Sequence, residues 1–166
     1  MHILMLGYAL LNEKTIMRRG GKYMEAEKDL RLFRIWLKAS KSIYRLIVED
    51  VKKNGFTMDN FEVLELLYNK GPQYIQTISE KLMIPSGSIT YVVNKLEEKG
   101  LVYKEQDENN RRYWEVCLTE EGEKIFQEIF PQHVETIQEL LSPFDEEQKD
   151  ELADLLKIIG IKAENQ

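Results

Sequence analysis

The sequence predicts a mainly α-helical fold with a small β-wing. Three observations carry this prediction: apolar residues recur at helical spacing near both ends of the chain, three short helical patterns occupy residues 57–100, and two β-rich runs follow Gly100. The chain has 166 residues, of which 43% are hydrophobic and 31% charged. These values are typical of one soluble domain, with or without helical extensions.

A long amphipathic helix is expected over residues 29–53. Its apolar side chains recur every three to four positions over much of this run, which places them on one helical face. Asn54 and Gly55 follow, and both tolerate the left-handed conformation in which many helices end. The helix should therefore end at about residue 53.

The residues before this helix carry no comparable pattern. The apolar start MHILMLGYALL lacks the basic segment of a secretory signal, and no small-residue cleavage site follows it. Arg18-Arg19-Gly20-Gly21 is what a purine-rich ribosome-binding sequence would encode, and Met24 follows closely. We therefore expect translation to start at Met24, with Met1 as the alternative, and residues 1–23 to be an upstream extension or disordered.

Residues 57–100 predict three short helices joined by tight turns. Thr57 can cap the first helix, and Gly71-Pro72 ends it. A break at Pro85 follows the second helix, and either Ser86 or Ser88 can cap the third. The expected spans are 57–70, 75–82 and 89–99.

The chain changes to a β pattern after the third helix. Residues 101–103 and 113–118 are rich in β-branched and aromatic side chains, and the polar segment DENNRR lies between them. This arrangement predicts a hairpin whose loop carries Arg111 and Arg112 at its tip.

Alternation in the second strand places Trp114, Val116 and Leu118 on one face. The same alternation turns Cys117 toward the outward face. As the single cysteine of the chain, Cys117 cannot form an internal disulfide, which excludes a disulfide-stapled secreted scaffold.

The last third of the chain predicts further helices. Thr119 opens the first of them, which has acidic residues in its first turn, where the helix dipole favours them. Pro131 should kink this helix or divide it in two, because its ring removes a backbone donor. Asp145 and Gln148 form a capping-box pattern at the start of the last helix.

Enzymatic chemistry finds little support in the sequence. No GxxxxGK[ST], GxGxxG or HExxH motif occurs, and the only histidines are His2 and His133. One cysteine and two histidines supply too few nitrogen and sulfur ligands for a structural zinc site. No run approaches the roughly 18 apolar residues of a membrane-spanning helix. We therefore expect a cytoplasmic protein that is not an enzyme, binds no metal or cofactor and does not enter a membrane.

The formal net charge of −6 first argues against a nucleic-acid partner, because phosphate binding usually requires a basic excess. The charge is polarised, however: +6 over residues 1–56, −3 over 57–119 and −9 over 120–166. Oppositely charged ends attract each other within a protomer or between two, unless both are simply solvated helix faces. DNA binding would then depend on a few placed cations, namely Lys95, Lys104, Arg111 and Arg112.

Three short helices followed by a two-stranded wing are the order of the winged helix-turn-helix. In that fold the third helix enters the major groove, and the wing loop reaches the backbone or the minor groove. Small hydroxyl side chains near the start of the third helix allow a close approach to phosphates, and tip arginines suit a narrow groove. The alternative is a polar helix that faces solvent. The residues that can face DNA are Ser86, Ser88, Thr90, Tyr91, Asn94 and Lys95.

Two segments carry a family resemblance: SITYVVNKLEEKGLV at residues 88–102 and RRYWEVCLTEEG at residues 111–122. With them, the chain from about residue 30 to residue 160 resembles the MarR family of bacterial transcriptional regulators. The segments LYNKGPQ, SGSITYVV and IFPQH also resemble the branch of that family that represses hydroquinone- and catechol-resistance genes.

The resemblance implies a homodimeric repressor whose two winged domains read a palindromic operator. It assigns residues 24–56 to an N-terminal dimerisation helix, 57–119 to the winged helix-turn-helix DNA-binding domain and 120–166 to C-terminal dimerisation helices. It also gives DNA-contact roles to the polar residues of the third helix and to Arg112.

Three positions depart from the family pattern. Asn110 and Asn94 stand at positions that Asp usually or often fills, and Lys104 stands where Arg is usual. Asn110 can still hydrogen-bond Arg112 but supplies no charge, and Lys104 keeps its charge without the guanidinium fork. The missing charge at Asn110 should make the wing less rigid.

Such regulators typically release DNA when a small, often aromatic, ligand enters the crevice between dimerisation helices and winged domain. The resemblance therefore implies a small-molecule effector here, of phenolic or quinone-like chemistry. The aromatic side chains that could line such a site suit core packing equally well. Oxidant sensing through Cys117 is a further alternative, although Glu115 lies beside it and no activating base is evident. The candidate ligand residues are Phe33, Trp36, Tyr44, Phe61, Phe126 and Phe130.

A second class of function stays open at this point. A winged domain can act as a protein-interaction module that never contacts DNA, and the acidic total favours that reading. Binding to DNA that weakens steeply with salt would distinguish the two classes.

Overall fold

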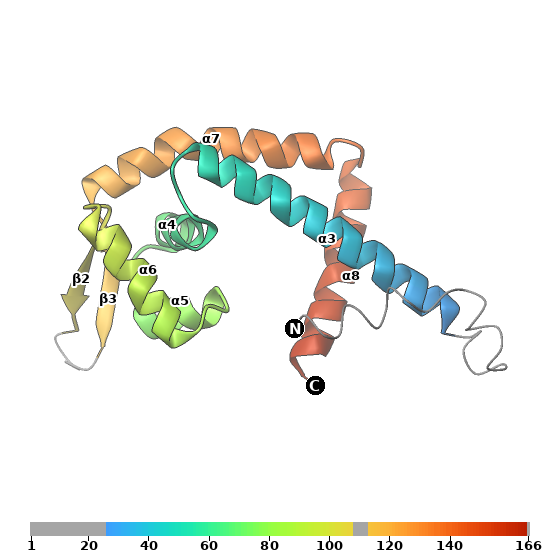
Figure 1. The fold of residues 1–166 in the computed structure, drawn as a ribbon, viewed down its shortest axis with the longest axis horizontal. Coiled ribbons are helices and arrows are strands. Elements are labelled where there is room, and N and C mark those ends of the chain that lie inside the picture. Colours follow the sequence, from blue (N-terminus) through green and yellow to red (C-terminus); the bar gives the residue numbers. More distant parts are fainter. Residues whose placement is uncertain (1–25, 108–112, 166) are drawn as a thin grey trace. The chain divides into compact units, whose positions relative to one another are not determined.

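The computed structural model describes residues 26–107 and 113–165 (Figure 1). Its contacts divide the chain into two units, one ending at Leu46 and the other beginning at Ile47. The helices are α3 (Glu27–Lys53), α4 (Met58–Lys70), α5 (Ile75–Lys81), α6 (Ser86–Glu98), α7 (Glu120–Leu141) and α8 (Glu146–Glu164). The strands are β1 (Gln73–Tyr74), β2 (Val102–Gln106) and β3 (Trp114–Leu118). This architecture confirms the predicted fold class, whereas the expected start at Met24 lies outside the described residues.

The described part of the first unit is the portion of α3 that ends at Leu46, and the rest of this helix belongs to the second unit. The helix opens with Glu27 and Asp29 in its first turn, where carboxylates complement the helix dipole. Several large apolar side chains of this portion are exposed to solvent in the described part of the chain. The apolar face of the helix is therefore not covered by its own unit. They include Leu32, Phe33, Ile35, Ile43 and Tyr44.

Three helix starts confirm the capping predictions. The Thr57 hydroxyl oxygen accepts a hydrogen bond from the backbone N–H of Asn60 at the start of α4. The Thr119 hydroxyl does the same for Gly122 at the start of α7. Asp145 and Gln148 form a complete capping box at the start of α8. Each cap satisfies backbone donors that the first turn of a helix leaves unpaired.

The predicted caps of the third short helix were wrong. Neither Ser86 nor Ser88 caps α6, because the helix already begins at Ser86 and Pro85 precedes it. The Pro85 carbonyl accepts the backbone N–H of Ser88 at 2.8 Å and that of Ile89 at 3.0 Å. The fixed backbone of proline thus starts the helix before the serines, and both hydroxyls are left on the helix surface.

The sequence predicted that Pro131 either kinks α7 or divides it in two. Helix α7 passes Pro131 as a single element, so division is wrong and a kink stays a prediction. Proline removes one backbone donor but leaves the rest of the ladder intact. Phe126 and His133 are buried on either side of it. These two side chains hold both halves of α7 on the same core.

The sheet has a third strand that the sequence did not reveal. The strand order is β1-β3-β2, and both pairings are antiparallel. The two residues of β1 pair with Val116 and Glu115, which makes β3 the central strand. A strand of two residues is too short to show alternation, so no pattern could predict it.

Cys117 is buried, with 5% of its surface exposed, which overturns its predicted outward position. It lies opposite Tyr103 in the pairing of β2 with β3. The cross-strand neighbour Tyr103 has a large side chain directly beside this small one, a contact that alternation along a single strand does not reveal. Burial raises the pKa of the Cys117 thiol, so the neutral form is favoured.

The core of the second unit lies among α4, α5, α6, β3 and the first half of α7. Figure 1 shows α4, α5 and α6 gathered beside the hairpin of β2 and β3, from which α7 leads away. α8 contributes no buried side chain. The largest fully buried side chains are Phe61, Phe126, Leu64, Ile78, Ile89 and Leu96.

A close backbone contact fastens α7 to the end of α6. The Thr119 hydroxyl donates to the Gly100 carbonyl at 2.7 Å, and the Thr119 N–H donates to the Leu101 carbonyl at 3.1 Å. A Cβ on Gly122 would lie 2.0 Å from the Leu101 carbonyl oxygen. Glycine is therefore required at this point of the LTEEG segment, because any side chain would collide with backbone.

Candidate nucleic-acid interface

The third helix of the winged unit, α6, has one buried and one exposed face. Ile89, Val92, Val93 and Leu96 are buried at helical spacing and anchor it to the core. The opposite face is therefore held in a fixed direction by apolar packing. This division is the one that the sequence predicted.

The exposed face of α6 carries the residues that were predicted to face DNA. Ser86, Ser88, Thr90, Tyr91 and Asn94 are exposed, and Lys95 is half-buried. Tyr91 is the most prominent of its large side chains, with 65% of its surface exposed. The structure thus places these six residues on the accessible surface of one helix. Their contacts with DNA remain a prediction.

Two of these side chains already have partners within the helix. The Thr90 hydroxyl donates to the Ser86 carbonyl at 3.2 Å, which directs it along the helix. The Lys95 ammonium lies 2.5 Å from Glu98 and 5.8 Å from the centre of the Tyr91 ring. The Glu98 carboxylate raises the pKa of Lys95, so the ammonium form is secure. Both charges of this pair are solvent-exposed and can exchange partners.

Lys104 connects the wing to α6. Its ammonium donates to the Asn94 amide oxygen at 2.8 Å and lies 2.8 Å from the Glu97 carboxylate. Its side chain is only 23% exposed. Lys104 therefore orients the Asn94 amide on the surface of α6. Sequence reasoning missed this role because the two residues lie on different elements.

The foot of the wing is held by Tyr74 of β1. Its hydroxyl donates to the Asp107 carboxylate at 2.5 Å, and its ring lies 5.7 Å from that of Tyr113. The Asp107 N–H also donates to the Tyr113 carbonyl at 3.1 Å. The two ends of the predicted wing loop are thus held together. Asn110, Arg111 and Arg112 of that loop lie outside the described residues.

Three of the six predicted ligand residues lie together. Phe126 lies between Phe61, at 5.4 Å between ring centres, and Phe130, at 5.1 Å. Tyr68 joins them at 5.0 Å from Phe126, a contact the sequence did not suggest. Phe61 and Phe126 are fully buried, so both are part of the core. Phe33, Trp36 and Tyr44 belong to the first unit, where Phe33 and Tyr44 are exposed.

A buried polar network adjoins these rings, and sequence reasoning missed it. His133 Nδ1 lies 2.8 Å from one carboxylate oxygen of Asp50, and the Thr136 hydroxyl donates to the other at 3.1 Å. Asp50 and His133 are 2% and 5% exposed, and the imidazole ring lies 4.5 Å from that of Phe61. The network joins the end of α3 to α7 with its buried carboxylate hydrogen-bonded. The one available signal was a histidine among apolar positions of a helix.

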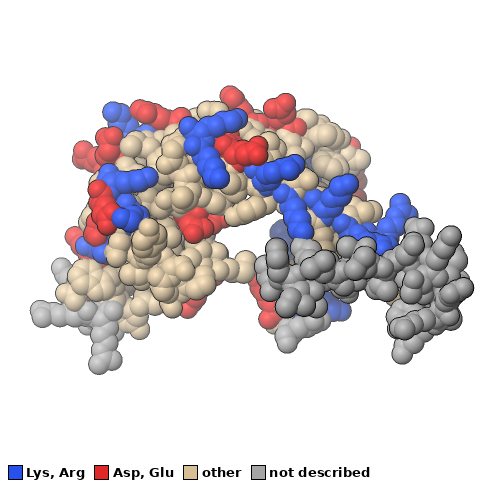
Figure 2. Space-filling view, in the orientation of Figure 1, with Lys and Arg blue, Asp and Glu red and all other residues tan. Residues whose placement is uncertain are grey.

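The winged unit has no broad basic face in the view of Figure 2. Basic and acidic side chains alternate over α6 and the hairpin, as the pairs Lys95–Glu98 and Lys104–Glu97 illustrate. Long-range attraction to a polyanion is therefore weak for this surface, and individual contacts must supply the affinity.

Within residues 26–107 and 113–165, no helix combines the length and apolar character that crossing a membrane requires. No group of three or more His, Cys, Asp or Glu side chains there could hold a metal ion.

A polar helix face on an apolar core, preceded by two short helices and followed by a hairpin, defines a winged helix-turn-helix protein of the DNA-binding class. Comparison with known proteins gives the family. The model of the MarR family matches residues 56–113. The chain is 39% identical over 137 residues to the HTH-type transcriptional regulator MhqR of Bacillus subtilis, covering 82% of this chain and 94% of MhqR. It is 36% identical over 150 residues to the regulator YkoM of the same organism, covering 90% and 97%.

The solved structures agree on the fold. AbsC, a MarR family transcriptional regulator from Streptomyces coelicolor, superposes with a TM-score of 0.78 at 22% identity, covering 84% of this chain and 97% of AbsC. The chain belongs to the MarR family and is a DNA-binding transcriptional regulator. Of the two function classes left open by the sequence, this one is therefore confirmed.

Proposed function

We propose that two copies of this chain bind a palindromic operator, repress transcription from it and release it when a small phenolic or quinone-like ligand binds. The observation that carries the DNA-binding part is the exposed polar face of α6, fixed by four buried apolar residues and bordered by the wing. A helix held in this way can enter a major groove without reorganising.

The recognition helix would read bases with short polar side chains. Asn94 presents an amide, which suits adenine, and Lys104 fixes its orientation at 2.8 Å. Ser86 and Ser88 at the start of α6 can approach phosphates closely. The wing would add contacts from Arg111 and Arg112 on the flank of the site.

A homodimer explains the apolar faces that the chain leaves exposed. Leu155 and Ile159 of α8 are 53% and 41% exposed, although both lie on one apolar stripe of that helix. Exposed stripes of this kind mark association surfaces. A two-fold dimer also presents two identical α6 helices to two half-sites, which a palindrome provides.

The effector part of the proposal follows from aromatic side chains and from the family. Phe61, Phe126, Phe130 and Tyr68 form a cluster whose rings could stack on an aromatic ligand. Structures with this fold include NadR in complex with 4-hydroxyphenylacetate and RdhR in a 2,4-dichlorophenol bound form. Phenols are therefore the first ligands to test.

Fluorescence anisotropy with the DNA upstream of its own gene tests the proposal. We expect saturable binding of two chains per site that weakens steeply as salt rises. Asn94→Ala should reduce affinity for this DNA several-fold and for random DNA much less, whereas Gln127→Ala on α7 should change neither. Absence of binding at low salt, or equal affinity for random DNA, would contradict the proposal. A thermal-shift screen of phenols and quinones, followed by DNA release, tests the effector.

A further inference from the structure

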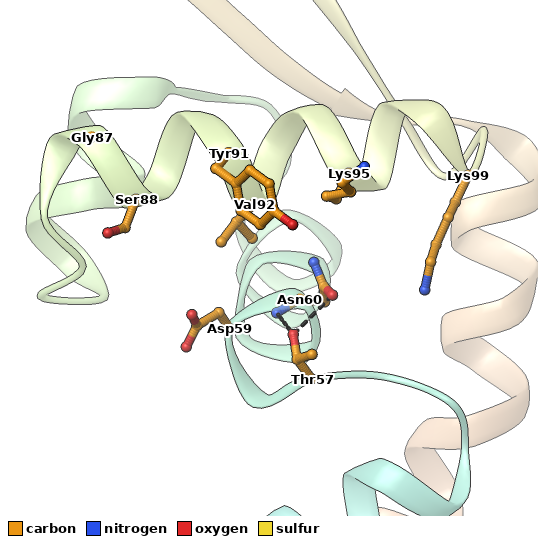
Figure 3. Close-up of a pocket in the computed structure, with 9 residues that line it drawn as sticks. All are labelled: Thr57, Asp59, Asn60, Gly87, Ser88, Tyr91, Val92, Lys95 and Lys99. Atoms are coloured by element: carbon orange, nitrogen blue, oxygen red, sulfur yellow. Dashed lines mark hydrogen bonds between the residues drawn. The ribbon is translucent and has the colours of Figure 1, made fainter.

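A hollow of about 630 Å³ lies between α6 and the N-terminal end of α4 (Figure 3). On the α6 side it is bordered by Ser88, Tyr91 and Lys95. The wing contacts the other flank of α6, where Lys104 bonds Asn94 and Glu97. Successive residues of an α-helix are about 100° apart, which places Ser88 and Lys95 at one edge of the exposed face of α6 and Glu97 at the other. The hollow and the wing therefore border α6 on different flanks of this face.

A buried amide points into the hollow. Asn60 is 7% exposed, and its Oδ1 accepts the Thr57 hydroxyl at 2.8 Å. Figure 3 shows its amide nitrogen pointing away from Thr57 and toward α6. Among the described residues this nitrogen donates no hydrogen bond, and it retains contact with solvent. An N–H₂ group held in that way favours an acceptor bound in the hollow.

Positive charge collects at the same end. The Lys99 side chain leaves the end of α6 and extends toward the start of α4, with its ammonium 5.1 Å from the centre of the Phe56 ring. The N-terminus of α4 adds the positive end of a helix dipole. The acidic residue of the lining, Asp59, lies at the opposite end in Figure 3, near Ser88.

The rest of the lining is suited to a sugar rather than to another charge. The Tyr91 ring and the buried Val92 form an apolar wall along the middle of the hollow. The Lys95 ammonium is bonded to Glu98, so this residue presents mainly its aliphatic stem. One end therefore offers hydrogen-bond donors and charge, and the middle offers apolar contact.

We propose that this hollow binds a phosphodiester of the operator backbone, through the Asn60 amide and the Lys99 ammonium at the start of α4. The proposal rests on the proposed function, in which α6 enters the major groove. A helix in that groove has a sugar-phosphate strand on each flank, and the wing occupies only one of them. The hollow receives the other strand, with the phosphate at the Asn60 end and the deoxyribose against Tyr91.

An isosteric charge change tests this assignment. Asn60→Asp keeps the acceptor for Thr57 and places a carboxylate in the first turn of α4, so the fold is preserved. We expect it to weaken DNA binding by at least tenfold, equally for operator and random DNA. Asp59→Asn should instead strengthen binding, because it removes the carboxylate of the rim. Unchanged affinity in a folded Asn60→Asp protein would overturn the proposal.

The salt dependence identifies the lost partner as a phosphate. Lys99→Gln should reduce the slope of log affinity against log salt by about 0.9, the value for one phosphate contact. The matched control is Lys70→Gln, the same charge change at the far end of α4, about 18 Å along the helix axis. Its slope should equal that of the wild type. Equal slopes for both variants would contradict the proposal.

Neutral methylphosphonate linkages in the operator locate the phosphate. One such linkage flanking each half-site should weaken the wild type, which loses its contact with the phosphate charge. The same linkage should strengthen binding by Asn60→Asp, because it removes the repulsion between the carboxylate and the phosphate. Titration of the DNA-free protein with inorganic phosphate, followed by NMR of the Asn60 side-chain amide, distinguishes a site for free phosphate from a site for the DNA backbone. A response to free phosphate with no linkage that couples to Asn60 would overturn the DNA assignment. Wild-type protein that fails to bind any DNA would instead contradict the proposed function.

Discussion

α6 and α8 are helices of the same unit, and both carry an apolar stripe, but the two stripes differ in burial. α6 buries four of its residues, whereas α8 buries none. The stripe of α6 packs on α4, α5 and the sheet of its own chain. That of α8 leaves Leu155 at 53% and Ile159 at 41% exposure.

The difference shows which part of the chain is complete by itself. Burial of the apolar face of α6 fixes the direction in which its polar face points, so the candidate DNA-binding surface is organised within one chain. The α8 face gains nothing from being exposed, because apolar area is stabilising only when it leaves water. In the proposed homodimer a second chain covers this face, as closed two-fold symmetry requires.

The largest effect is expected from a substitution that disrupts the packed core, where α7 contacts the backbone after α6. Gly122→Ala places a Cβ 2.0 Å from the Leu101 carbonyl oxygen, and neither backbone can yield easily. We expect the free energy of unfolding to fall by about 3 kcal/mol, measured by urea denaturation. Gly160→Ala in α8 is the control: no atom lies within 4 Å of its Cβ, so about 0.5–1 kcal/mol of stabilisation is expected. Similar effects at the two glycines would refute the distinction.

The second largest effect is expected from substitutions in the exposed apolar stripe of α8. Leu155→Glu with Ile159→Glu removes apolar area from α8 without touching the core of the unit. We expect sedimentation to show a shift from dimer to monomer and the melting temperature to lose its dependence on concentration. Lys157→Glu changes charge on the opposite side of α8 and should leave the dimer intact. A double variant that remains dimeric would show that α8 is not the association surface.

A smaller effect concerns the wing. Tyr74→Phe removes the hydroxyl that bonds Asp107 at 2.5 Å but keeps the ring against Tyr113. Because this contact joins the wing foot to β1, we expect operator affinity to fall several-fold with the melting temperature nearly unchanged. Tyr113→Phe is the matched control, since its ring contact survives, and should bind like the wild type. A loss of affinity of the same size in both variants would argue against a role for the hydroxyl.

The smallest effect is expected at Cys117. Burial raises its thiol pKa above the usual value of 9.0, so the reactive thiolate is scarce at neutral pH. Alkylation of the native protein should be much slower at pH 8 than that of the urea-unfolded chain and should accelerate as pH rises beyond the usual value. Because the raised folded pKa favours the neutral thiol, its contribution to stability is complete below about pH 9 and declines above it.

The same site makes a prediction about sensing. Cys117→Ser should leave release of DNA by phenolic compounds unchanged, as measured by anisotropy. Loss of the response in that variant would restore the cysteine as a sensor.

Much of the fold followed from local patterns. Helical spacing, the caps at Thr57, Thr119 and Asp145, and the stops after α3 and α4 were read correctly, since each depends on residues close in sequence. The errors arose where a local rule competed with its surroundings. Pro85 started α6 ahead of the serines, and α7 continued through Pro131 because buried residues on both sides held it to one core.

The candidate interface likewise had one part that the sequence predicted and one part that it did not. The polar face of α6 could be predicted, because it is the complement of an apolar stripe. The role of Lys104 toward Asn94, the hold of Tyr74 on Asp107 and the buried pair of Asp50 and His133 could not. In each case the partners are separated along the chain and meet only when the elements pack.

By itself, the sequence determined the order of helices and wing, the residues that α6 turns outward and the polarity of charge along the chain. These depend on periodicity and on turn chemistry, which act over a few residues. The tertiary structure alone decided that Cys117 is covered, that Gly122 has no room for a side chain and that the start of α4 borders the recognition helix. Burial and close approach are properties of packed elements, and no local pattern contains them.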